Sequence, residues 1–128
     1  MVLLAQVMGG LFGLLAVIFG AFGAHVLKKT FTTEQLASFE TGVKYQMYHA
    51  LLILMLSFNL NLDSSLERNM MYCFLIGTFL FSFSIYGLCL SAAKGSKIRF
   101  LGPITPLGGL FLVLGWGLLC YSFIKNLI

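Results

Sequence analysis

The chain has 128 residues, of which 59% are hydrophobic and only 9% charged, and its mean hydropathy is +0.97. A water-soluble domain of this length could not bury so much apolar surface, which excludes a soluble globular protein. At about 20 residues per membrane-spanning helix, the chain has room for four such helices and no separate soluble module. We therefore predict one integral membrane domain, residues 1–128, with an all-α fold of four transmembrane helices in a bundle.

The net charge of +4 comes from eight Lys and Arg against four Asp and Glu. These basic residues lie between the apolar runs, where they orient a membrane protein, and no basic tract interleaved with aromatics predicts a nucleic-acid partner. Because positively charged loops stay inside, we expect both termini outside the cytoplasm, in the bacterial cell (inner) membrane. The loops expected inside carry Lys28, Lys29, Lys94, Lys97 and Arg99, whereas the other side has Arg68 and Lys125.

The first predicted helix, about residues 2–27, contains small residues at helical spacing and no charged side chain before Lys28. A stripe of small residues lets two membrane helices approach closely. We expect this stripe to pack within the bundle or between subunits, so that a homo-oligomer through glycine faces is one expected partner, besides membrane lipids. The residues of this face are Gly9, Gly13, Ala16, Gly20 and Ala24, and His25 ends the helix.

The second predicted helix, about residues 33–60, begins with a capping box in which Thr32 is the N-cap and Gln35 reaches back. Apolar residues then recur at helical spacing among charges, which predicts an amphipathic interfacial segment between helices one and two. The span proper is expected to begin near Tyr45. The apolar residues of the segment are Leu36, Phe39, Val43 and Met47.

A polar stripe enters this second span. Residues three and four apart share a helix face, so Tyr45, Gln46 and His49 line up, one turn after Thr41. Polar side chains inside a membrane must face protein, and they are functional candidates by default. Together with His25, they are predicted to form one polar cluster just below the cytoplasmic headgroups, closed above by Glu40 and Lys44.

The third predicted helix, about residues 65–93, starts at a second capping box, Ser64 to Glu67. Along it, Thr78, Ser82 and Tyr86 recur at every fourth residue. Such hydroxyls can bond carbonyls of their own helix, pack between helices, or line a functional path, and Ser82 is included in the candidate site.

The fourth predicted helix, about residues 106–126, has Thr105 as N-cap and Pro106 at its first position. Gly108 and Gly115 share a face and are expected to pack closely. Trp116 lies in mid-helix, and its indole N–H requires a partner, which predicts that it faces the bundle.

Several of these segments resemble the small membrane proteins grouped as domain of unknown function 423, which include transmembrane protein 256 of animals. The matching segments are Gly20–His25, Thr41–Leu51, Leu80–Ser82 with Tyr86, and Leu101–Gly109 with Gly115–Trp116. One departure is Phe83, where the family pattern is expected to have glycine. The resemblance spans essentially the whole chain and implies a small polytopic membrane protein, without assigning an activity.

Three functional hypotheses follow. The sequence contains no motif typical of a nucleotide-binding loop, a hydrolase or a metalloprotease, so we favour a non-enzymatic protein with a structural, assembly or lipid-organising role and no cofactor or metal. The second is a small channel or carrier whose path is lined by His25, Thr41, Tyr45, Gln46, His49 and Ser82. The third is a haem or metal protein that uses His25 and His49 as ligands.

Overall fold

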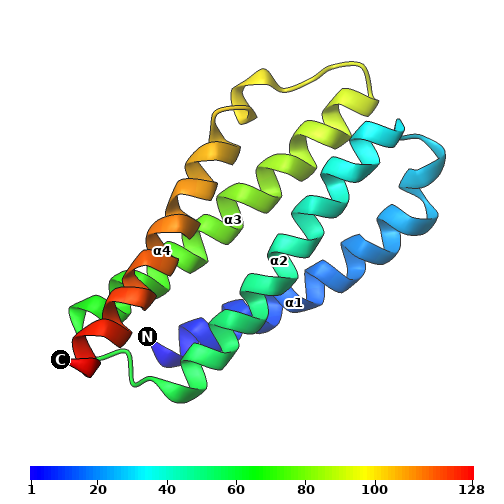
Figure 1. The fold of residues 1–128 in the computed structure, drawn as a ribbon. Coiled ribbons are helices and arrows are strands. Elements are labelled where there is room, and N and C mark those ends of the chain that lie inside the picture. The colour runs from blue at the N-terminus through cyan, green and yellow to red at the C-terminus, as the bar shows by residue number, and fades with distance from the viewer.

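A computed structural model describes residues 1–128 and contains four long helices lying side by side (Figure 1). They are α1 (Val2–His25), α2 (Thr33–Asn59), α3 (Ser65–Ala93) and α4 (Ile104–Leu127), with 3-10 turns η1 (Leu27–Lys29) and η2 (Arg99–Leu101). Packing follows chain order, with α1 against α2, α2 against α3, and α3 against α4. Successive helices run in opposite directions, so both termini lie at one end of the molecule (Figure 1).

Three of the four helices are long and apolar enough to cross a membrane: Val2–Lys29, Ser65–Ala93 and Arg99–Leu127. Of the four predicted transmembrane helices, three are therefore supported by length and composition. The remaining helix, α2, has 27 residues. It is long enough to span, but its first half carries Glu34, Glu40 and Lys44, which lower its hydropathy.

The predicted interfacial segment is not a separate element, because α2 is one continuous helix from Thr33. Its capping box is present: the Thr32 hydroxyl accepts from the Gln35 N–H, and the Gln35 side chain accepts from the Thr32 N–H, each at 3.1 Å. Phe39 does not lie at the membrane surface. It is buried against the rings of Phe31 and Tyr86, with centroids 5.7 and 4.9 Å away. The apolar face of this segment thus packs within the protein.

The start of α4 also differs from the prediction. The helix begins at Ile104 with Pro103 as its N-cap, so Thr105 lies inside the first turn. The Thr105 hydroxyl instead shares a hydrogen bond of 2.6 Å with Ser84 of α3. Pro106 is tolerated there because the first N–H groups of a helix have no partner within the helix.

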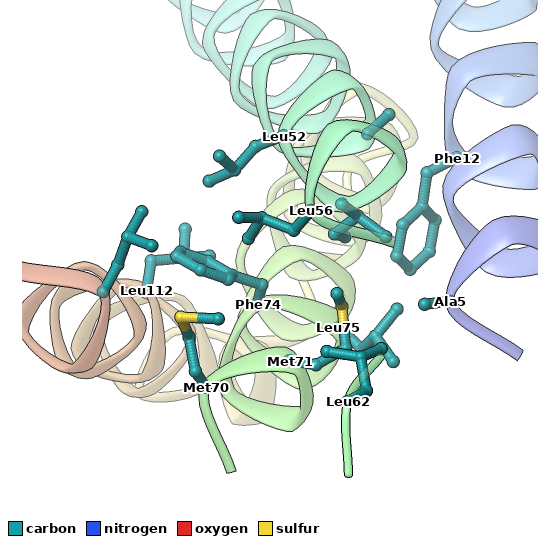
Figure 2. Close-up of a cluster of buried hydrophobic side chains, with 13 residues drawn as sticks. Ala5, Phe12, Leu52, Leu56, Leu62, Met70, Met71, Phe74, Leu75 and Leu112 are labelled. Atoms are coloured by element: carbon teal, nitrogen blue, oxygen red, sulfur yellow. The ribbon is translucent and has the colours of Figure 1, made fainter. Parts of the chain in front are cut away.

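The main apolar core lies toward the end of the bundle that holds the termini. All four helices contribute to it, and Phe12 of α1 and Leu112 of α4 reach it from opposite sides of α2 and α3 (Figure 2). A smaller apolar cluster, which includes Phe39 and Tyr86, lies toward the other end. Gln46 and His49, two buried polar residues of α2, lie between these two clusters.

Glycines set the distances between neighbouring helices. On α1, a Cβ added at Gly9 would lie 2.9 Å from Leu54 Cγ of α2, and one at Gly20 would lie 3.3 Å from Val43 Cγ1. The small-residue face of α1 therefore packs inside the chain, against α2. On α4, a Cβ at Gly108 would lie 2.8 Å from the Cα of Phe81 on α3.

Candidate functional site

The candidate site is built around Gln46, which is 0% exposed in the middle of α2. Its Nε2 donates to the backbone carbonyl of Phe12 on α1 at 2.7 Å. Its Oε1 accepts from the hydroxyl of Tyr86 on α3, also at 2.7 Å. A helical carbonyl has a second lone pair free for such a bond. One side chain of α2 therefore joins α1, α2 and α3.

A second bond between α2 and α3 lies one turn away. The hydroxyl of Ser82 donates to the backbone carbonyl of Gly42 at 2.7 Å. A Cβ at position 42 would lie 2.9 Å from Cε1 of Tyr86. The glycine thus lets α3 approach closely enough for Ser82 to reach the backbone of α2 and for Tyr86 to reach Gln46.

His49 connects α2 to α4. Its Nδ1 lies 2.7 Å from the carbonyl oxygen of Tyr45, and its Nε2 lies 3.2 Å from Nε1 of Trp116. A carbonyl can only accept, and an indole N–H can only donate. The geometry therefore assigns the proton of a neutral imidazole to Nδ1 and leaves the Nε2 lone pair to Trp116. Both ring nitrogens are used within the protein.

Aromatic rings surround the imidazole. Tyr45 stacks on His49, with ring centroids 6.1 Å apart, and also packs on Phe81 of α3 at 4.9 Å. Trp116 meets Phe74 edge to face at 5.7 Å. Tyr45 and Trp116 are 42% and 47% exposed. They therefore form the outer surface of the site, between α2 and α4.

The structure does not bring His25 to this cluster. His25 is exposed at the end of α1, whereas a Cβ at Gly13 would lie 3.9 Å from Ala50, the neighbour of His49. His25 is twelve residues beyond Gly13, or roughly 18 Å along the helix. The prediction of a shared histidine site is therefore wrong. It treated the residues before Tyr45 as a surface segment, but they pack along the end of α1: a Cβ at Gly23 would lie 3.1 Å from Cδ1 of Phe39, about ten residues before His49.

Other predicted site residues also lie outside the cluster. Thr41 is exposed, and its hydroxyl donates to the carbonyl of Ala37 on its own helix at 3.0 Å. Glu40 and Lys44 are exposed as well, so they do not close the cluster from above. Of the six residues predicted to form it, the structure brings together Tyr45, Gln46, His49 and Ser82.

Two residues of the site were not among the predicted site residues: Tyr86, which bonds Gln46, and Trp116, which bonds His49. Both carried a signal in the sequence. Tyr86 continues the fourfold spacing of Thr78 and Ser82. The N–H of a tryptophan in mid-helix needs a partner, and His49 supplies it. What the sequence did not reveal was which helix each of them faces.

In the polar network of α2, as elsewhere in the structure, every buried side-chain nitrogen and oxygen atom has a hydrogen-bond partner. Gln46 and Ser82 link α2 to its neighbours, His49 links it to α4, and Ser84 with Thr105 links α3 to α4. No group of three or more His, Cys, Asp and Glu side chains is placed to hold a metal ion. These hydrogen bonds connect all four helices.

Two cavities flank the network. A polar cleft of about 720 Å³ lies between the first turns of α2 and the segment from Lys97 to Thr105, with α3 as its floor. An apolar cavity of about 450 Å³ lies between α1 and α3 and is lined by Phe19, Phe39 and Phe83. Phe83, the departure from the family pattern, packs there against Phe19 and Tyr86, with ring centroids 6.1 and 5.6 Å away.

Comparison with known proteins gives a consistent set of relatives. The family model described as Protein of unknown function (DUF423) matches residues 19–109. The chain is 38% identical over 114 residues to the UPF0382 inner membrane protein YgdD of Escherichia coli, covering 88% of this chain and 83% of that one. It is 34% identical to a UPF0382 membrane protein of Haemophilus influenzae, covering 89% and 88%. A UPF0382 membrane protein of Schizosaccharomyces pombe is 39% identical, covering 81% and 87%. No solved structure matches.

Proposed function

Because the chain belongs to the family of membrane proteins described as Protein of unknown function (DUF423), whose name assigns no activity, we propose its role from the site itself. The protein is a non-enzymatic integral membrane protein with a structural, assembly or lipid-organising role, and its polar cluster is a tether. One observation carries this proposal: the buried polar side chains are all hydrogen-bonded within the chain. Within the polar cluster, no buried side-chain nitrogen or oxygen atom is left without a partner for a substrate to take.

The proposal includes four membrane-spanning helices. α1 and α3 are both apolar enough to span, and they run in the same direction (Figure 1). The chain must therefore return across the membrane between them, and α2 is the segment that connects them. Gln46 and His49 are tolerated in mid-helix because they are buried against α1, α3 and α4, away from lipid.

We also propose that both termini face away from the cytoplasm, in the bacterial inner membrane. The end formed by η1 and the α3–α4 loop carries five lysines and arginines, and such loops remain in the cytoplasm. Single cysteines placed at Ser64 and Ser96 test the orientation. The Ser64 site is expected to react faster with an impermeant thiol reagent in intact cells, after the three native cysteines have been replaced. Faster reaction at Ser96 would contradict the orientation.

A channel or carrier path through the same residues is less well supported. His25 lies far from the cluster, and Gln46 is held between Phe12 and Tyr86 with no exposed surface. A path would require these bonds to open together.

Two measurements together distinguish a structural tether between helices from a transport path. Purified protein in liposomes is tested for ion and proton flux, and the thermal stability of His49→Ala is measured in detergent. A tether predicts no flux above that of empty liposomes, together with lowered stability of the variant. A flux that the wild type supports and His49→Ala abolishes, in a variant that remains folded, would overturn the proposal.

A further inference from the structure

The polar cleft at the basic end of the molecule is not part of the tether. Its walls are the first turns of α2 and the segment from Lys97 to Thr105, and its floor includes Ile85 and Cys89 of α3. At about 720 Å³ it lies within the size range of small-molecule sites. It lies between α2 and the start of α4, both of which pack against α3.

The lining carries one negative and one positive group. Glu34 lies on the α2 wall, and Lys97 lies on the opposite wall. The hydroxyls of Thr32 and Thr41 are engaged within α2, in the capping box and with the carbonyl of Ala37. Glu34, Ser38, Lys97 and the amide Nε2 of Gln35 are therefore the polar side-chain groups of the lining left for a ligand. Such a site suits a zwitterion whose two charges lie on opposite sides.

The surface below the cleft is apolar and aromatic. Glu34, Ser38 and Thr41 share a helix face that continues, at spacings of three and four, through Tyr45 and Tyr48. These tyrosines are 42% and 60% exposed. Trp116 of α4 is 47% exposed and is joined to α2 by its hydrogen bond to His49. A ligand in the cleft would therefore have polar surroundings at one end and aromatic side chains at the other.

We propose that the cleft binds the headgroup of a zwitterionic aminophospholipid, with the phosphate at Lys97 and the primary ammonium at Glu34. The acyl chains then lie along Tyr45, Tyr48 and Trp116. This inference rests on the proposed lipid-organising role. A phosphoglycerol headgroup has no positive charge to pair with Glu34, and a trimethylammonium headgroup has no N–H to donate to it.

The test measures lipid affinity of the purified full-length protein in detergent, by native mass spectrometry. Dioleoyl phosphatidylethanolamine, phosphatidylcholine and phosphatidylglycerol are titrated with identical acyl chains. We expect phosphatidylethanolamine to bind about two- to fivefold more tightly than the other two, as one exposed charged pair allows. Glu34→Gln should remove the preference over phosphatidylcholine, and Lys97→Gln should weaken binding of all three lipids.

Matched controls use charges outside the cleft. Glu40→Gln on α2 and Lys94→Gln at the end of α3 remove the same charges from exposed positions, and both should bind lipids like the wild type. Soluble glycerophosphoethanolamine at equal concentration should not displace the lipid. Its equal competition would indicate a site for a soluble headgroup and would overturn the lipid assignment.

Equal affinity for the three lipids, or equal losses in the cleft and control variants, would overturn the inference. The flux measurement keeps the two proposals apart. Absence of both flux and lipid preference removes this inference alone, whereas a His49-dependent flux removes the proposed function whatever the lipid result.

Discussion

The α1–α2 and α3–α4 interfaces both rely on glycine, but the glycines meet different neighbours. At the α1–α2 interface, a Cβ at Gly9 or Gly20 would meet side chains, Leu54 and Val43. At the α3–α4 interface, a Cβ at Gly108 would meet the backbone of Leu80 and Phe81, including the carbonyl carbon of Leu80 at 2.9 Å. The backbones are therefore closer at Gly108 than at any glycine of α1.

A stripe of small residues therefore does not show by itself how strongly the packing of two helices depends on it. A side chain can rotate away from an added methyl group, whereas a helix backbone cannot move without its hydrogen bonds. The two interfaces also differ in polar bonding. The α1–α2 pair is reinforced by the buried bond from Gln46 to Phe12, and the α3–α4 pair has the half-buried Ser84–Thr105 bond.

The largest expected effect is that of Gly108→Ala. The added methyl group would overlap the backbone of α3, and the loss in unfolding free energy should be about 3 kcal/mol, the upper part of the usual range for overpacking. Thermal unfolding in detergent measures it. The matched control is Gly117→Ala on the same helix, where a Cβ would meet nothing within 4 Å, and it should change stability by less than about 0.5 kcal/mol. Equal losses of stability in Gly108→Ala and Gly117→Ala would contradict the expectation that contact with the α3 backbone makes the first substitution the more destabilising one.

Gln46→Leu should be next. It removes the bonds to Phe12 and Tyr86 with little change in volume, and at roughly 0.6–1.7 kcal/mol for each bond between membrane helices the loss is about 1–3 kcal/mol. Tyr86→Phe removes only one of the bonds and should cost about half as much. Because the two residues share a bond, the double variant should lose less than the sum. Strict additivity would show that the bond contributes nothing.

The glycines of α1 should show a graded response. Gly9→Ala should cost about 1 kcal/mol because Leu54 must shift, the lower end of the range for overpacking. Gly13→Ala should be nearly neutral, since its Cβ would lie 3.9 Å from Ala50. Gly13→Leu, in contrast, should separate α1 from α2. Thermal unfolding and oligomeric state in detergent are measured together. Loss of an oligomer with unchanged unfolding would indicate that this face packs between subunits instead.

The smallest expected effect is that of Trp116→Phe. The ring contact with Phe74 is retained, and only the hydrogen bond to His49 is lost, which should cost about 0.6 kcal/mol. Trp116 is the single tryptophan of the chain, so its fluorescence in His49→Phe reports the same bond independently. A loss as large as that of Gln46→Leu would mean that α4 is held mainly through His49.

Much of the fold could be predicted from local sequence. The apolar composition indicated a membrane protein. The four helical segments and the two capping boxes at Thr32 and Ser64 indicated where one helix ends and the next begins. These features depend on residues close together along the chain. The start of α4 was misplaced by two residues, because Thr105 bonds Ser84, a residue that is distant in sequence.

The candidate site could be predicted only in part. The shared face of Tyr45, Gln46 and His49 follows from helical spacing alone. The hydrogen-bond partners of Gln46 and His49 on other helices cannot be predicted from this spacing, because they lie on three different helices. The pairing of His25 with His49 failed for the same reason: it depends on how far α2 runs alongside α1 before His49 is reached.

The helices, their caps and the polar stripe could be predicted from sequence, since each depends on residues within a few positions of one another. The register between helices could not, because it comes from packing between distant segments, and it is this register that brings Gln46 to Phe12 and Tyr86 while His25 stays exposed. Register is set by the summed packing of whole faces, including Gly9 on Leu54 and Gly108 on Phe81. A shift of one turn, about 5.4 Å, would break every hydrogen bond of the cluster that joins two helices.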